Sequence, residues 1–191
     1  MKKLTTISIL IAIGVVLQYV DNILSLGLIT GGKIGLANIV NIIAINMFCL
    51  NKNFANAKFN DSYSLFVIRY SFGIVYSIAL SRALLGGLIG AGVLSAAYSI
   101  CGSLLAVSVM LAVRPNRNLS YIGIGILGAS SNNLGQILFA CLLLKSYSPF
   151  AYFPYLLLLS AFTGAAVGYI GQLLSVRLFR TQMPQMLRTA D

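Results

Sequence analysis

The chain has 191 residues, of which 59% are hydrophobic and only 8% are charged, and its mean hydropathy is +0.92. A soluble fold of this length could not cover so much apolar surface, so we expect an all-α integral membrane protein in contact with membrane lipid. The net charge of +10 does not indicate a nucleic-acid partner, because lysine and arginine stand singly or in pairs between apolar runs and do not gather on one water-exposed face.

Apolar stretches near the roughly 20 residues that cross about 30 Å of hydrocarbon follow one another along the chain. They predict one transmembrane domain over residues 1–191, a six-helix bundle with helices at 4–26, 34–50, 64–84, 88–113, 119–144 and 151–178. The break between the third and fourth helices depends on the pair Gly86-Gly87. The first segment exceeds the roughly 7–15 residues of a signal-peptide core and ends without a small-residue cleavage site, so we expect a retained helix.

The distribution of basic residues predicts the orientation. With the N-terminus in the cytoplasm, Lys33 and Lys145 fall on the outer side, and Arg69 and Arg82 lie within the third helix. The other nine fall on the cytoplasmic side: Lys2, Lys3, Lys52, Lys58, Arg114, Arg117, Arg177, Arg180 and Arg188. Because positive charges near helix ends resist translocation, this asymmetry predicts a multi-pass protein of the plasma (cytoplasmic) membrane with both termini in the cytoplasm.

The residues that most enzymes use for catalysis are scarce. The chain has no histidine, and its only acidic residues are Asp21, Asp61 and Asp191. Histidine-dependent triads are therefore impossible, a metal site is not expected, and no segment offers paired carboxylates. The chain also contains no Walker-type GxxxxGK[ST] stretch. We expect a protein that is not an enzyme and that needs no cofactor.

Polar side chains at membrane depth are costly, which makes them candidates for function. Asn38 and Asn41 are three residues apart on the second helix, and Asn132 and Gln136 are four apart on the fifth, with Asn133 beside them. Each pair therefore shares one helix face. Their carboxamides can bind a ligand or can join helices by hydrogen bonds, and both interpretations stay open.

The predicted orientation brings these groups toward the outer half of the membrane. Arg82 ends the third helix there, close to the predicted positions of Asp21 and Lys33. We expect a pocket between the helices that opens outward, with Arg82 and Lys33 receiving an anionic group of a small-molecule ligand. The alternative is that Asp21 acts as the counter-charge and forms an ion pair with Arg82. Tyr152, Tyr155 and Ser160 of the sixth helix are expected on the same side.

Small residues on the first helix suggest a second kind of contact. Ser8 and Ala12 form a small-xxx-small pair, which permits the close approach of another helix. Such pairs serve either internal packing or the docking of a partner membrane protein.

Four ordered motifs resemble a known family. They are residues 33–40 (KIGLANIV), 82–88 (RALLGGL), 132–136 (NNLGQ) and the run 154–164. Together they resemble the Gx transporter family, also named heptaprenyl diphosphate synthase component I, over nearly the whole chain. The motif positions carried over are Lys33, Asn38, Arg82, Asn133 and Gln136. This chain has Asn132 where family members often carry histidine.

The resemblance implies a fold and partners. The family is similar to the substrate-binding S components of energy-coupling-factor (ECF) transporters, which implies a six-helix, S-component-like bundle that captures a small molecule outside. Its implied partners are a transmembrane coupling subunit and two ATPases. The family's other name implies a membrane component that works with a separate polyprenyl diphosphate synthase catalytic subunit in heptaprenyl or isoprenoid quinone synthesis. Three scattered aspartates cannot supply the Mg²⁺-binding DDxxD motifs of such a synthase. A purely structural membrane scaffold is the third alternative.

Overall fold

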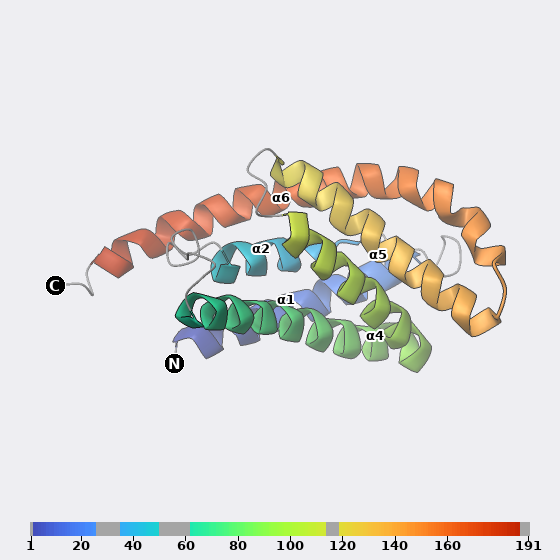
Figure 1. The fold of residues 1–191 in the computed structure, drawn as a ribbon, viewed down its shortest axis with the longest axis horizontal. Coiled ribbons are helices and arrows are strands. Elements are labelled where there is room, and N and C mark those ends of the chain that lie inside the picture. Colours follow the sequence, from blue (N-terminus) through green and yellow to red (C-terminus); the bar gives the residue numbers. More distant parts are fainter. Residues whose placement is uncertain (1, 26–34, 50–61, 114–118, 188–191) are drawn as a thin grey trace.

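The computed structural model describes residues 2–25, 35–49, 62–113 and 119–187, and all regular elements in this part of the chain are helical (Figure 1). In chain order they are α1 (Lys2–Ser25), α2 (Asn38–Cys49), α4 (Ser62–Val113), α5 (Tyr121–Leu144), the 3₁₀ helix η1 (Ser148–Tyr152) and α6 (Phe153–Leu187). Among the described residues, five stretches are long and apolar enough to cross a membrane: Leu4–Leu24, Tyr70–Gly90, Gly92–Val113, Tyr121–Leu144 and Ser148–Ser175. The chain is therefore a multi-pass membrane protein whose described part is all-helical.

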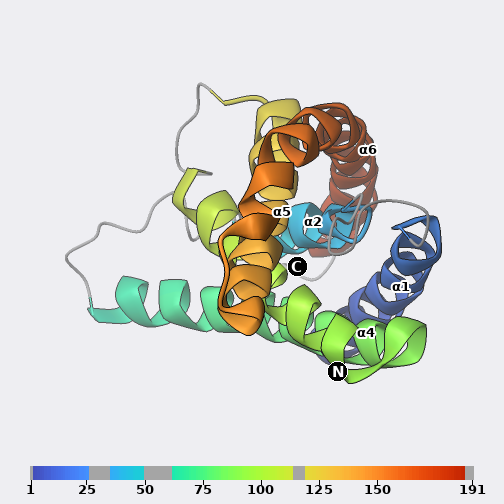
Figure 2. The ribbon, with the colours of Figure 1, turned by 90° about the vertical axis from the view of Figure 1, so that its right-hand side faces the viewer.

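The long helix α4 folds back on itself at Gly92, where the backbone has a φ of 81° (Figure 2). A side chain at this φ would be strained, so glycine permits the reversal. We call residues 62–91 the first arm of α4 and Gly92–Val113 its second arm. The predicted break at Gly86-Gly87 is wrong by a few residues, because both glycines remain helical. They serve close packing instead, since a Cβ on Gly86 would overlap Gln18 and one on Gly87 would overlap Ala96.

Two other helix boundaries differ from the predictions. The second helix, expected at 34–50, is described as the 12-residue α2, which follows a turn at residues 35–37 and spans about 18 Å. It is too short to cross the hydrocarbon alone. The sixth helix, expected at 151–178, continues to Leu187 and is preceded by η1, whose Ser148-Pro149 start favours a separate 3₁₀ turn. α5 begins at Tyr121, because the hydroxyl of Ser120 accepts the Gly123 N–H and caps the helix.

Glycines allow the later helices to lie side by side. α5 and α6 run antiparallel, and a Cβ on Gly125 would overlap the backbone of Gly164 and Gly168. The second arm of α4 also packs antiparallel against α5, where Gly102 and Gly135 meet. Without side chains at these positions the backbones approach closely, as is common in membrane helix packing.

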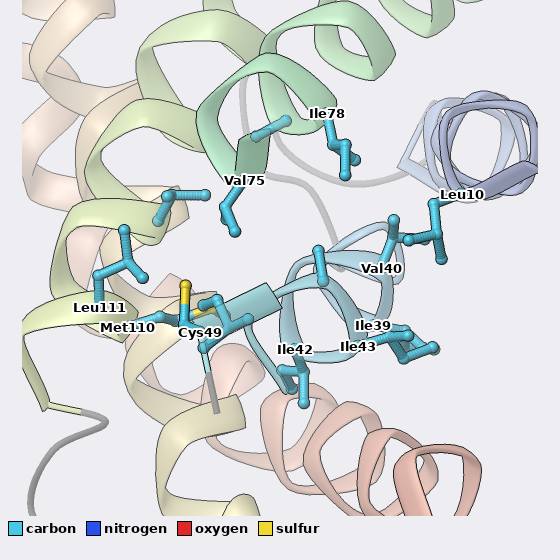
Figure 3. Close-up of a cluster of buried hydrophobic side chains, with 14 of the residues drawn as sticks. Leu10, Ile39, Val40, Ile42, Ile43, Cys49, Val75, Ile78, Met110 and Leu111 are labelled. Atoms are coloured by element: carbon cyan, nitrogen blue, oxygen red, sulfur yellow. The ribbon is translucent and has the colours of Figure 1, made fainter. Parts of the chain in front are cut away.

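The short helix α2 lies in the centre of the molecule, and ten of its 12 residues are buried. Figure 3 shows Ile39, Val40, Ile42 and Ile43 of α2 among apolar side chains of α1 and α4, including Leu10 and Val75. Many large apolar residues of α1, α4, α5 and α6 are exposed instead. This apolar exterior around a packed interior suits a lipid environment.

Candidate functional site

Buried polar side chains of this membrane domain surround an arginine. Arg82 lies on the first arm of α4, within the candidate span Tyr70–Gly90, and only 1% of its surface is exposed. Its guanidinium donates four hydrogen bonds to oxygen atoms of three other helical segments. The acceptors are Gln18 Oε1 at 3.0 Å, Asn41 Oδ1 at 3.3 Å, Asn38 Oδ1 at 3.4 Å and Ser103 Oγ at 3.4 Å. We call Arg82 and these four residues the Arg82 cluster.

The four acceptors come from three helical segments that pack around Arg82. Gln18 belongs to α1, Asn38 and Asn41 to α2, and Ser103 to the second arm of α4. The aliphatic stem of Arg82 passes over Gly14, where a Cβ would approach its Cδ at 2.9 Å. A glycine at this position therefore makes room for the arginine between α1 and α4.

Asp21 is buried beside the cluster and holds the turn that leads into α2. Both of its carboxylate oxygens accept the backbone N–H of Gly35, at 3.1 and 3.0 Å. Gly35 has a φ of 87°, which suits glycine in this turn. The carboxylate also interacts electrostatically with Arg82. A negative charge at the start of α2 complements both the arginine and the partial positive charge of the helix N-terminus.

Further hydrogen bonds tie the amides to neighbouring helices. Asn41 Nδ2 donates to Asn38 Oδ1 at 3.2 Å, and Gln18 Nε2 donates to Ser99 Oγ at 3.2 Å. One turn along α1, Asn22 Nδ2 donates to the Gly86 carbonyl at 3.0 Å. These bonds fix the orientation of each amide, because a carbonyl or guanidinium partner distinguishes the oxygen from the nitrogen.

The three predicted amides of α5 are buried, and two of them, Asn132 and Gln136, pack against the second arm of α4. Asn132 is 6% exposed, and Asn133 and Gln136 are each 1% exposed. A Cβ on Gly102 would lie 2.7 Å from Asn132 Oδ1 and 2.9 Å from Gln136 Cγ. The Gln136 side chain therefore packs at Gly102, one residue along the chain from Ser103, which accepts a hydrogen bond from Arg82.

Some buried amide atoms in this region have no hydrogen-bond partner among the residues that the structure describes. Both polar atoms of Gln136 are in this state, as are Asn38 Nδ2 and Asn22 Oδ1. Each unsatisfied buried polar atom costs about 1–3 kcal/mol. Such atoms call for an explanation, and an additional binding partner is one.

The structure brings together most of the predicted site residues but not all of the polar groups expected near them. Lys33 lies outside the described residues. Ser8 and Ala12 are exposed on the outside of α1, and Ser8 Oγ donates to the Leu4 carbonyl. The side chains of Tyr152 and Tyr155 are 50% and 49% exposed, so they do not point into the bundle.

Two groups of polar residues were not predicted. Ser99 and Ser103 contribute to the polar interior from the second arm of α4, and their four-residue spacing in an apolar helix was the available signal. Asn46 of α2 donates to Ser175 Oγ of α6 at 2.9 Å. This bond joins helices away from Arg82 and has the form expected of a structural contact.

Comparison with known proteins adds a family to this geometry. A family model described as heptaprenyl diphosphate synthase component I matches residues 60–174, which is more than half of the chain. The matched region contains Arg82, Ser103 and the three α5 amides, and it ends before the last turns of α6. No curated protein and no solved structure gave a match.

Proposed function

Because the chain belongs to the heptaprenyl diphosphate synthase component I family, we propose that it is a non-catalytic membrane subunit that binds a small molecule at the Arg82 cluster. The observation that carries this proposal is a fully buried arginine surrounded by polar side chains of α1, α2 and both arms of α4. Ionisable residues at membrane depth are expensive and are retained mainly where they bind or move something.

The proposed topology is a six-segment bundle of the plasma (cytoplasmic) membrane with both termini in the cytoplasm. The start of α1 and the end of α6 lie at the same end of the molecule in Figure 1, which supports an even number of crossings. Five candidate spans and the buried α2 together make six segments. Irregular backbone such as the turn before α2 is tolerated at membrane depth where protein surrounds it, and Gly35 in that turn is buried.

The ligand proposed for this site carries an anionic group that binds Arg82. Three of the four hydrogen bonds from the guanidinium are 3.3 Å or longer, beyond the usual range of about 2.7–3.2 Å. Neutral amide and hydroxyl oxygens hold the cation loosely, whereas a carboxylate or phosphate would form shorter and stronger charge-assisted bonds. The cluster can therefore exchange internal partners for a ligand. The capture of that ligand from the outer side follows from the proposed topology.

The partners in this proposal are those of an S-component-like transporter subunit: a transmembrane coupling subunit and two ATPases. Transport against a gradient requires an energy source, and the chain contains no Walker-type motif. The exposed small-residue face of α1 with Ser8 and Ala12 is available for such a partner.

An alternative is supported by the name of the family, which pairs a first component with a separate heptaprenyl diphosphate synthase catalytic subunit. In this alternative the chain anchors or supplies that subunit at the membrane. Purification from native membranes in mild detergent separates the two. Native mass spectrometry that finds a bound small molecule, together with co-purified ATPases, would support the transporter subunit. A protein that carries no small molecule but co-purifies with a DDxxD-containing synthase would refute the transporter proposal and support the synthase-subunit alternative.

A further inference from the structure

The unpartnered amide of Gln136 restricts the chemistry of the ligand. Its side chain is 1% exposed, and neither Nε2 nor Oε1 has a hydrogen-bond partner in the described part of the chain. Reversing the amide does not help, because both atoms are in the same condition. Gln136 therefore offers one donor group and one acceptor side by side.

Asn38, a hydrogen-bond partner of Arg82, offers a second unused group. Its Oδ1 accepts from Asn41 Nδ2 and Arg82 Nη2, which fixes the orientation of the amide and leaves Nδ2 without a partner in the described residues. The turn before α2 brings this nitrogen near α5, since Gly35 is close to both Asn38 Nδ2 and Ala129. Ala129, Asn133 and Gln136 share one face of α5.

These groups do not match an acceptor-only ligand. Ionised phosphate and carboxylate oxygens accept hydrogen bonds from Arg82 and Asn38, but they would face Gln136 Oε1 with no hydrogen to offer. A group that has an N–H next to a carbonyl oxygen pairs with both atoms of the carboxamide at once.

We propose that the ligand carries, besides its anionic group, a carboxamide-like group (a primary or secondary amide, lactam, imide or ureido group) that forms a two-point hydrogen-bonded pair with Gln136. This inference depends on the proposed function and specifies the chemical class of its ligand. Gln136 selects the uncharged part of the molecule, and Arg82 binds its anionic part.

The substitution Gln136→Met tests this pair, because methionine has a similar length and shape without polar atoms. The variant and the wild type are purified from the same membranes, and the retained small molecule is measured by native mass spectrometry. We expect retention to fall at least about tenfold, the loss of two hydrogen bonds. The ligand-free variant should unfold at the same or a higher temperature than ligand-free wild type, because two unsatisfied atoms are removed.

The matched control is Asn46→Leu, which removes a buried amide that is already paired with Ser175. It should lower the unfolding temperature and leave ligand retention unchanged. If the methionine variant does not accumulate in the membrane, Gln136→Leu removes the same polar atoms with a shorter side chain, and we expect the same loss of ligand.

Retention by both Gln136 variants at the wild-type level would overturn the inference while leaving the proposed function intact. The same holds if the molecule released by denaturation contains no N–H next to a carbonyl oxygen. A wild-type protein without any bound molecule would instead contradict the proposed function itself.

Discussion

Removing the charge of Arg82 and the charge of Asp21 together should cost less stability than the two separate losses predict. Arg82→Met removes four hydrogen bonds. Interhelical hydrogen bonds in membranes average about 0.6 kcal/mol, so their loss costs roughly 2.4 kcal/mol. The carboxylate of Asp21, which interacts electrostatically with Arg82, is then buried without its counter-charge. Breaking one side of a buried charge pair costs about 3–5 kcal/mol in total, and we expect about 4 kcal/mol here.

The substitution Asp21→Asn leaves the arginine uncompensated but keeps an oxygen that can accept the Gly35 N–H, so we expect a smaller loss of about 2 kcal/mol. In the double variant neither charge remains, and the cost should fall to about 4 kcal/mol instead of the additive 6 kcal/mol, a coupling of about 2 kcal/mol. Unfolding free energies are measured by titrating SDS into mixed micelles and following helix content by circular dichroism.

A control pair calibrates this measurement. Asn46→Ala removes the bond to Ser175 of α6, and its effect should add to that of Asp21→Asn within about 0.5 kcal/mol. If Asp21→Asn and Arg82→Met are equally additive, the two side chains do not compensate each other and the electrostatic description of the cluster is wrong.

Three further substitutions, one of them with a matched control, test a hydrogen bond, helix packing and the reversal of α4. Asn46→Ala alone should cost about 0.6–1.7 kcal/mol in the same titration without changing ligand retention, because it removes the interhelical hydrogen bond to Ser175 of α6, away from Arg82. Gly125→Val should abolish accumulation of folded protein on membrane immunoblots, since its side chain would overlap α6, whereas Gly73→Ala, with nothing within 4 Å, should accumulate normally. Gly92→Ala should lower the free energy of unfolding by roughly 1–2 kcal/mol, the cost of a left-handed backbone conformation for a residue with a side chain.

The sequence predicted the membrane class and the approximate positions of the α-helices that the structure describes, because long apolar runs are a strong signal. It placed the reversal of α4 at Gly86-Gly87, since glycine pairs often mark turns, although the reversal occurs at Gly92. Sequence pattern alone does not distinguish Gly86 and Gly87, which pack against Gln18 and Ala96, from Gly92, which has the positive φ of the reversal.

The polar residues of the site could be predicted better than their interactions. Arg82 and the amides of α2 and α5 could be identified from the sequence because burying polar side chains at membrane depth is energetically costly. The contribution of Ser103 depends on the second arm of α4 folding back against Arg82, which is a long-range contact. The bond from Gly35 to Asp21 also depends on tertiary structure, because the turn before α2 brings a backbone N–H to a residue of α1.

The charge-free double variant Asp21→Asn/Arg82→Met also gives the most direct test of ligand binding at this cluster. Since it should remain folded, a loss of ligand cannot be attributed to unfolding. Native mass spectrometry of protein from native membranes should find a small molecule on the wild type and none on the folded double variant. Retention of the same molecule by both proteins would contradict binding of the ligand at Arg82.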